Sequence, residues 1–217
     1  MQKLTRGILV TIEGIDCCGK STLIQNLVPL LVNLPTIFTK EPGDTPLGKS
    51  IRTMVKNLET PLAPKTEFLL YAADRAQHMH EIVKLALTEK KLIISDRMAD
   101  SSVVYQGYAR DLDINLIQQV NAWAMDNIVP DFTLFIDFDP KVAVQRTREK
   151  EQANNKSFFC SDPDLYYMQR AANGYHELFK NRKDVITLDG THTPQELAQQ
   201  AAKIIDKWLL KNNVYEQ

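Results

Sequence analysis

Short apolar runs alternate with longer segments of helical period along the whole chain, and this alternation restricts the fold more than any other feature. The runs are rich in Val, Ile, Leu and Phe, as expected for strands that are buried on both faces. They are ILVTIE (8–13), TIFTK (36–40), KLIISD (91–96), FTLFID (132–137) and VITLD (185–189). The remaining pattern predicts helices at about 19–33, 45–57, 65–89, 113–127, 140–150, 163–181 and 194–212. We therefore predict an α/β fold, a five-stranded parallel sheet flanked by helices.

Size and composition fit one domain over residues 1–217. The chain has 44% hydrophobic residues, and its 26 basic and 27 acidic residues give a formal charge of -1. This balance does not favour binding of nucleic acid. The three cysteines, two of them adjacent, make no disulfide framework. The N-terminal apolar run is too short for a signal sequence or a membrane span, so we expect a soluble cytoplasmic protein.

A glycine-rich loop follows the first apolar run. Gly14, Gly19, Lys20 and Ser21 match the pattern G-x-x-x-x-G-K-[ST], with a predicted strand before it and a predicted helix after it. Backbone N–H groups and the helix N-terminus of such a loop bind phosphates, the lysine reaches the terminal phosphates, and the serine hydroxyl ligates Mg²⁺. The alternative is a chance Gly-Lys turn. We expect a nucleoside triphosphate to contact Gly14, Ile15, Asp16, Cys17, Cys18, Gly19, Lys20, Ser21 and Thr22.

Asp96 and Arg97 end the third apolar run, at the edge of the sheet where ligands bind in this fold class. The Asp96 carboxylate could hold Mg²⁺ directly or through water, and the Arg97 guanidinium suits bidentate binding of a phosphate. The alternative for Asp96 is an ordinary salt bridge, and the alternative for Arg97 is helix capping or a surface ion pair. The loop motif alone does not separate a kinase from a GTPase or a nucleotide-driven regulator.

Four segments together resemble one family. They are IEGIDCCGKST (12–22), KEPGDTPLGKSIR (40–52), EFLLYAADRAQH (67–78) and DRMADSSVVYQG (96–107). In this order they closely resemble the bacterial thymidylate kinases, P-loop nucleoside monophosphate kinases that phosphorylate dTMP. The resemblance implies ATP as the phosphoryl donor, Mg²⁺, a three-layer P-loop NTPase fold with a mobile lid at about 147–162, a role in dTTP biosynthesis, and a homodimer.

The resemblance also implies roles for the acceptor site. Arg97 and Arg52 would bind the dTMP phosphate, and Asp16 would approach the sugar 3′-hydroxyl, with capping of the following helix as its alternative. Tyr71 would stack on thymine in place of the more usual Phe, unless it is simply a core residue. The residues implied to bind dTMP are Asp16, Glu41, Arg52, Tyr71, Arg75, Arg97, Ser101, Tyr105 and Gln106.

Two departures from the family pattern concern charge. Some relatives have a P-loop arginine where this chain has the neutral Cys17, so the lid must supply the cation that stabilises the transferred phosphoryl group. The Asp-Arg pair common in bacterial lids is absent from 156–164. We predict that Arg148 supplies this charge, with a solvated helix-end charge as its alternative. The other candidates are Lys150, Lys156 and Arg170, and Arg146 is implied to lie against adenine.

The adjacent cysteines have two explanations. Relatives place varied side chains at these positions, which favours Cys17 and Cys18 as inert filler. A redox role is the alternative, because loop amides and the helix dipole would lower the pKa of a thiol there. Two rivals to the dTMP kinase also remain at this point: a deoxynucleoside kinase of the same fold, and a regulatory protein that nucleotide merely switches.

Overall fold

The computed structural model describes residues 2–56, 62–154 and 165–216, and the predicted parallel sheet is present. Its strands are β1 (Ile8–Glu13), β2 (Thr36–Lys40), β3 (Leu92–Asp96), β4 (Phe132–Asp137) and β5 (Val185–Asp189). They are parallel throughout, in the order β2-β3-β1-β4-β5. β1 is central, and its Val10 lies between Ile94 of β3 and Phe132 of β4. The predicted fold class is confirmed.

Helices connect these strands. In the described ranges they are α1 (Lys20–Leu27), α2 (Pro46–Lys56), α3 (Pro64–His78), α4 (Lys84–Thr88), α5 (Ala99–Ser102), α6 (Ile114–Ala124), α7 (Pro140–Asn154), α8 (Leu165–Phe179) and α9 (Pro194–Lys211). Three shorter turns adjoin them: the 3₁₀ segment η1 (Val28–Leu31) and the π segments η2 (Met79–Val83) and η3 (Val103–Tyr108). No helix of the described residues has the length and apolar character needed to cross a bilayer.

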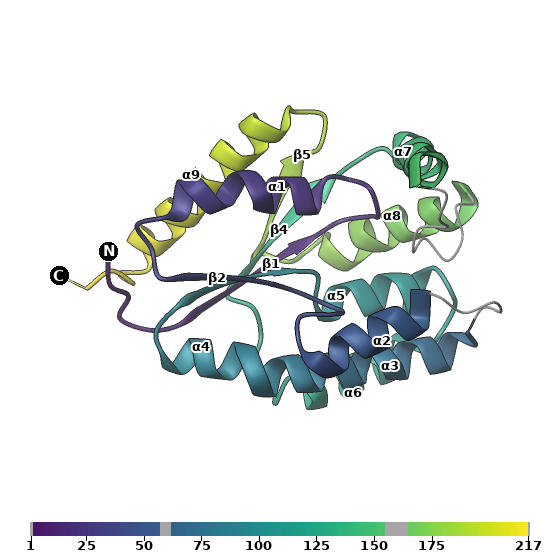
Figure 1. Ribbon diagram of the computed structural model, residues 1–217, viewed down its shortest axis with the longest axis horizontal. Coiled ribbons are helices and arrows are strands. Elements are labelled where there is room, and N and C mark those ends of the chain that lie inside the picture. The colour runs from purple at the N-terminus through teal and green to yellow at the C-terminus, as the bar shows by residue number, and fades with distance from the viewer. Residues whose placement is uncertain (1, 57–61, 155–164, 217) are drawn as a thin grey trace.

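The sheet separates two helical layers (Figure 1). Alternate residues of a strand point to opposite faces. Val10 of β1 therefore joins the cluster that contains Leu23 of α1 and Ile205 of α9, whereas its neighbour Leu9 packs with Met79 and other residues on the α3–α4 side. Because both faces are covered at the centre of the sheet, β1, β3 and β4 are almost entirely buried, which explains the apolar runs from which they were predicted.

Two helical predictions need correction. The segment 99–108 was not predicted as helical, but it forms α5 followed by the π segment η3, a combination too short to show a clear period. The predicted helix at 65–89 continues through α4 but contains the π segment η2 in its middle.

Helix α7 extends beyond the predicted helix at 140–150. It continues to Asn154, and residues 155–164 lie outside the described part of the chain. Residues 148–154 contain one apolar residue, Ala153, and so lack the apolar stripe that normally indicates a helix. Their Arg, Glu, Lys and Gln residues nevertheless favour helix by intrinsic propensity.

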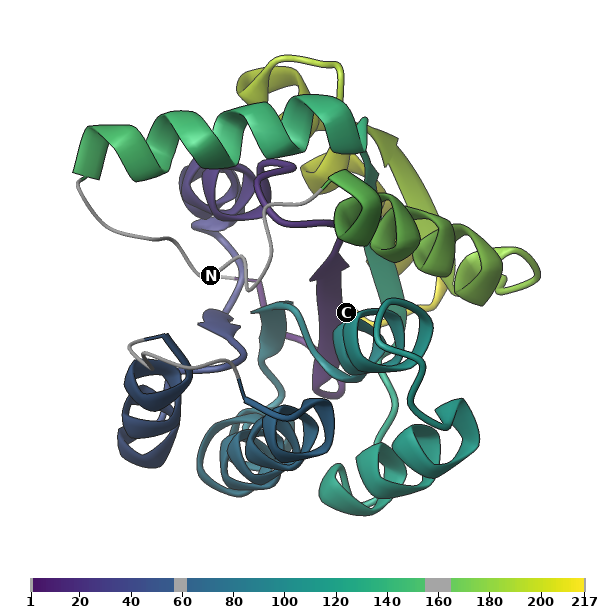
Figure 2. The same cartoon turned by 90° about the vertical axis from the view of Figure 1, so that its right-hand side faces the viewer.

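The carboxyl ends of the parallel strands lie at one end of the molecule. Figure 2 faces this end, with α7 crossing above α1 and with α8 beside the sheet. The loop after β1 and the residues after β2 and β3 therefore converge here, as the fold class predicts.

Candidate active site

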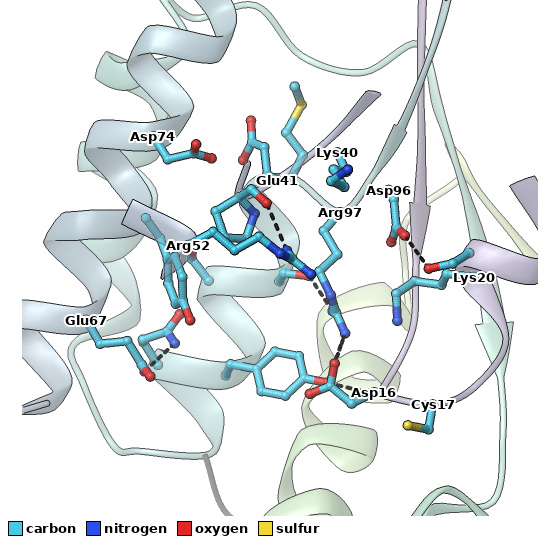
Figure 3. A pocket seen from close by; sticks show the side chains of 18 of the residues that line it. Asp16, Cys17, Lys20, Lys40, Glu41, Arg52, Glu67, Asp74, Asp96 and Arg97 are labelled. Atoms are coloured by element: carbon cyan, nitrogen blue, oxygen red, sulfur yellow. Dashed lines mark hydrogen bonds and ion pairs between the residues drawn. The ribbon is translucent and has the colours of Figure 1, made fainter. Parts of the chain in front are cut away.

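One cavity of about 310 Å³ opens at the carboxyl ends of the strands. Figure 3 shows Lys20 and Asp96 on one side of it, Glu67 and Asp74 on the opposite side, and Arg97 between them. Most of the predicted site residues line it, namely Asp16, Cys17, Gly19, Lys20, Ser21, Thr22, Glu41, Arg52, Tyr71, Arg75, Asp96, Arg97, Ser101, Tyr105 and Gln106. Residues predicted for the donor side and residues predicted for the acceptor side therefore line the same cavity.

The loop between β1 and α1 has the geometry of a phosphate-binding loop. Gly14 has φ of 147°, and a Cβ there would lie 2.8 Å from the carbonyl oxygen of Ile136, so no larger residue fits. Lys20 is buried and donates hydrogen bonds to the carbonyl oxygens of Gly14 (3.0 Å) and Ile15 (2.8 Å). The ammonium group is therefore held at the mouth of the loop, beside the N-terminus of α1, where anions bind.

A candidate cation position adjoins this loop. The hydroxyl of Ser21 donates to Asp96 Oδ2 at 3.1 Å, and Asp96 Oδ1 is buried without a hydrogen-bond partner in the described residues. Hydroxyl and carboxylate oxygens are the ligands that Mg²⁺ prefers, so these side chains fit the predicted ion. In the same ranges no cluster of three or more His, Cys, Asp or Glu side chains could hold a metal, so phosphate and water would complete the coordination.

Arg97 is the centre of the acceptor side. Its backbone has φ of 70°, a conformation that L-residues rarely adopt, and its Nη2 contacts Asp16 Oδ1 at 2.5 Å. Nη1 donates to Ser101 Oγ (2.8 Å) and to Tyr175 Oη (3.3 Å). The guanidinium also lies over the ring of Tyr105, 5.0 Å from its centroid. These contacts fix the plane of the group within the cavity wall.

Behind Arg97 lies Glu13, a buried carboxylate that the sequence analysis did not select. Its Oε2 accepts hydrogen bonds from Ser101 Oγ (2.6 Å) and Tyr175 Oη (2.7 Å), and its Oε1 accepts from the backbone N–H of Met98 (2.9 Å). Burial, and then the charge of Asp100, raise the pKa of Glu13. Because both hydroxyls donate to Glu13, their lone pairs are left to accept from Arg97.

Helix α3 forms the opposite wall with Tyr71 and Arg75, which share one face as their spacing predicts. Arg75 is buried. It donates to Asn121 Oδ1 (2.7 Å), the Met98 carbonyl (3.0 Å) and Ser102 Oγ (3.2 Å), and its Nε lies 2.9 Å from Glu41 Oε2. The guanidinium is therefore fixed by protein groups before any base is bound.

Glu41 and Arg52 come from the segment after β2. Glu41 is buried and also contacts His78 Nδ1 at 2.8 Å, so this predicted dTMP ligand is embedded in a polar network. Arg52 Nη1 donates to the carbonyl of Pro42 at 2.9 Å. Nearby, burial followed by the charge of Glu41 raises the pKa of Asp74 to about 6, and Asp74 Oδ2 is buried without a partner in the described residues.

Helix α7 contacts the tip of the phosphate-binding loop at Cys17, whose φ is 58°. Thr147 Oγ1 donates to Cys17 Sγ at 3.2 Å, and Lys150 Nζ lies 4.0 Å from the same sulfur. Arg146 stacks on Phe138, with its guanidinium carbon 4.3 Å from the ring centroid, and reaches the Cys17 carbonyl at 3.4 Å. The inner face of α7 is thus turned toward the loop.

The cations predicted for the lid lie in different environments. Lys150 and Thr147 line the cavity and Arg148 does not, although the side chains of Lys150 and Arg148 are both exposed. Arg170 binds the Tyr108 carbonyl and the Asp111 carboxylate, away from the cavity. Lys156 and the segment 156–164 lie outside the described residues. The role predicted for Arg148 stays a prediction, and Lys150 is the cation that the structure brings into the site.

The cysteines differ in environment. Cys18 is buried against the loop, and burial raises the pKa of its thiol. The lowered pKa on which a redox role depended is therefore wrong for Cys18, because loss of hydration outweighs the nearby positive charge of Lys20. Cys17 is half-buried and contacts α7, as described above.

Several further lining or supporting residues were not predicted from the sequence, among them Glu13, Glu67, Asp74, Thr147 and Tyr175. The available signal was a charged residue inside an apolar pattern, as with Glu13 at the end of ILVTIE. Buried charges are rare unless they have partners, so each such position indicates a polar network.

Comparison with known proteins identifies the family. The family model described as thymidylate kinase matches residues 12–201, most of the chain. The chain belongs to the thymidylate kinase family. The thymidylate kinase of Halothermothrix orenii is 38% identical over 208 residues, covering 95% of this chain and all of that protein. That of Bacillus cereus strain B4264 is 36% identical over 209 residues, covering 94% of this chain and all of that protein.

A solved structure supports the same family. The crystal structure of thymidylate kinase from Ehrlichia chaffeensis matches with a TM-score of 0.73 and 28% identity, covering 92% of this chain and 99% of that one. The P-loop NTPase fold implied by the motifs is confirmed. As a thymidylate kinase, the protein is a nucleoside monophosphate kinase that phosphorylates dTMP from a nucleotide donor. The deoxynucleoside kinase and the regulatory protein are thereby not supported.

Proposed function

We propose that ATP is the donor and that Mg²⁺ assists in-line transfer of its terminal phosphoryl group to dTMP, as a step toward dTTP. One observation supports this best: the phosphate-binding loop with Lys20 lines the same cavity as Arg97, whose guanidinium suits an acceptor phosphate. Phosphoryl transfer requires little covalent chemistry from the protein beyond alignment and neutralisation of charge. This cavity provides residues for both.

On the donor side, the loop from Gly14 to Thr22 would bind the ATP phosphates, with Lys20 at the terminal ones and Arg146 toward the adenine. Ser21 and Asp96 would hold Mg²⁺, which when bound neutralises phosphate charge. The side chain of Cys17 supplies no positive charge there, and Lys150 lies 4.0 Å from its sulfur. We therefore assign the additional cation first to Lys150 and second to Arg148.

On the acceptor side, Arg97 and Arg52 would bind the dTMP phosphate, and Asp16 would approach the 3′-hydroxyl. Tyr71 would stack on the base, and Arg75 and Gln106 would contact its polar edge. The remaining acceptor residues are Glu41, Ser101 and Tyr105. Asp16 contacts Arg97 directly, so binding of phosphate and of sugar would be linked at this pair.

A coupled assay with purified protein tests the proposal. Turnover should require dTMP, ATP and Mg²⁺ together; removal of Mg²⁺ with excess EDTA should abolish it, and added Mg²⁺ should restore it. Asp96→Asn should raise the Mg²⁺ concentration needed for half-maximal rate, with the KM for dTMP little changed. Equal rates with and without divalent cation, or phosphorylation of thymidine but not dTMP, would contradict the proposal.

We also propose that the chain works as one kinase domain with a lid at about 147–162, in the cytoplasm, and as a homodimer. The apolar side chains that support the dimer lie on α6, where Trp123 is 80% exposed and Leu116 is 56% exposed. These residues are seven apart, two helical turns, and so lie on one face. Leu69 of the adjacent α3 is exposed as well. A second copy would cover this face.

A further inference from the structure

The side-chain amide of Gln106 is held in one orientation by Glu67. Gln106 is 2% exposed and lines the cavity from η3, and its Nε2 donates to Glu67 Oε2 at 2.8 Å. Its Oε1 is buried without a hydrogen-bond partner in the described residues. The amide therefore has a satisfied donor on one side and an unsatisfied acceptor on the other.

The chemistry of Glu67 makes this orientation specific. An ionised carboxylate only accepts hydrogen bonds, so the neighbouring amide must turn its NH₂ group toward it. Arg110 Nη2 lies 3.7 Å from the other oxygen, Glu67 Oε1, and pairs with the carboxylate. Without such a partner the two orientations of a glutamine amide are nearly equivalent in shape. Glu67 thus determines that the oxygen of the Gln106 amide, and not its NH₂ group, is without a partner in the described residues.

An unsatisfied buried acceptor needs a donor from the ligand. A buried polar group without a partner is costly, so a ligand that supplies the missing hydrogen bond is favoured over one that does not. The imide edge of thymine or uracil carries a ring N–H between two carbonyls. The ring nitrogen of cytosine at the same position carries a lone pair, which would face the lone pairs of Gln106 Oε1.

We propose that Glu67 is a specificity-determining residue that acts through Gln106: it fixes the amide so that the cavity presents an acceptor to the ring N–H of an imide base. The proposal rests on the placement of the base against Tyr71, Arg75 and Gln106 under the proposed function. Glu67 positions Gln106 and does not itself contact the base.

The test compares two substrates that share the 5-methyl group, dTMP and 5-methyl-dCMP, by their kcat/KM values. In Glu67→Gln the amide of Gln106 can turn round, so the preference for dTMP should fall at least tenfold, with the KM for ATP unchanged. In a Gln106→Ala background the preference should already be low, and adding Glu67→Gln should change it less than twofold. Glu81→Gln is the matched control, because Glu81 also accepts a hydrogen bond from a glutamine amide, that of Gln77, and does not line the cavity; it should keep the wild-type preference.

Three outcomes would overturn the proposal: an unchanged preference in Glu67→Gln, an equal loss of activity with both substrates, or an effect of Glu67→Gln that persists without Gln106. If Glu67→Gln does not fold, ¹⁵N-labelled wild-type protein with dTMP decides the matter. Nuclear Overhauser contacts of the Gln106 amide protons should then be to Glu67, and contacts to the thymine imide proton instead would refute the proposal. Failure of the wild-type protein to phosphorylate dTMP would contradict the assigned activity, which is a separate result.

Discussion

At the scale of single residues, Asp74 makes the stability of the protein depend on pH. Its folded-state pKa of about 6 exceeds the ordinary 3.8, because burial and then Glu41 disfavour the charged form, and His78 and Arg75 only partly compensate. The folded protein therefore binds more protons than the unfolded chain between these values. The contribution of Asp74 to stability is full below about pH 4 and is lost as the pH rises through about 6.

Asp74→Asn should accordingly raise the free energy of unfolding at pH 8, by up to about 3 kcal/mol, and change it little near pH 4. Urea unfolding at the two pH values measures this. Asp184 provides a control of opposite sign, because its hydrogen bond to Arg182 lowers its pKa. Asp184→Asn should remove a stabilising charge at pH 8 and lose its effect in acid. A shift of the same sign in both variants would contradict the argument.

Tyr175 is a positioning residue for Arg97. Removing its hydroxyl takes away one of the acceptors that fix the guanidinium and one of the donors to Glu13. Tyr175→Phe should raise the KM for dTMP about five- to thirtyfold, corresponding to about 1–2 kcal/mol, while the KM for ATP changes little. Steady-state kinetics with each substrate varied in turn provide the measurement.

Tyr215→Phe is the matched control for Tyr175→Phe. It also removes a tyrosine hydroxyl that donates to a carboxylate, that of Asp206, but it lies near the C-terminus. It should leave both KM values unchanged. If Tyr175→Phe altered kcat alone, or both KM values equally, the positioning role would be wrong.

At the scale of elements, the orientation of α7 predicts which cation reaches the donor phosphates. Lys150 and Arg148 are two residues apart, and the helix turns only one of them into the cavity. Lys150→Ala should lower kcat at least tenfold, and Arg148→Ala should leave it within twofold. Single-turnover measurements with saturating ATP and dTMP separate this effect from product release. The reverse result would uphold the sequence-based assignment to Arg148.

The elements differ in how far they could be predicted. Strands and long helices could be predicted from their apolar pattern, because the residues that each of them buries are close together in the sequence. The part of α7 beyond residue 150 could not, because it has no apolar stripe and is favoured only by local propensity. The segment 99–108 could not either, because α5 and η3 together span only a few turns and change helical type at Val103.

The site residues also differ in how far they could be predicted from the sequence. Loop and strand-end residues such as Lys20 and Arg97 were predictable, because motif and topology fix their positions. Glu13, Glu67 and Tyr175 were not, because their roles depend on pairs that are distant in sequence: 162 residues separate Glu13 from Tyr175, and 39 separate Glu67 from Gln106. Hydrogen bonds of this kind leave no periodic signal in a single sequence.

At the scale of the whole molecule, the exposed face of α6 predicts association. Trp123→Glu places a charge at the centre of the proposed interface and should convert the dimer to a monomer at micromolar concentration, as sedimentation velocity would detect. Leu210→Glu, a change at another exposed leucine on α9, is the control and should leave the dimer intact. A wild-type protein that sediments as a monomer would refute the proposed assembly.

The hydrogen-bonded group of Glu13, Ser101, Tyr175 and Arg97 connects β1, α5 and α8. Any displacement of α8 would move the Tyr175 hydroxyl and, through Arg97, would change how the acceptor phosphate is bound. If donor binding shifts α8, then donor and acceptor affinities are thermodynamically linked, and the factor by which ATP tightens dTMP must equal the factor by which dTMP tightens ATP. A single tyrosine hydroxyl would then carry the coupling, and Tyr175→Phe would bring both factors toward one together.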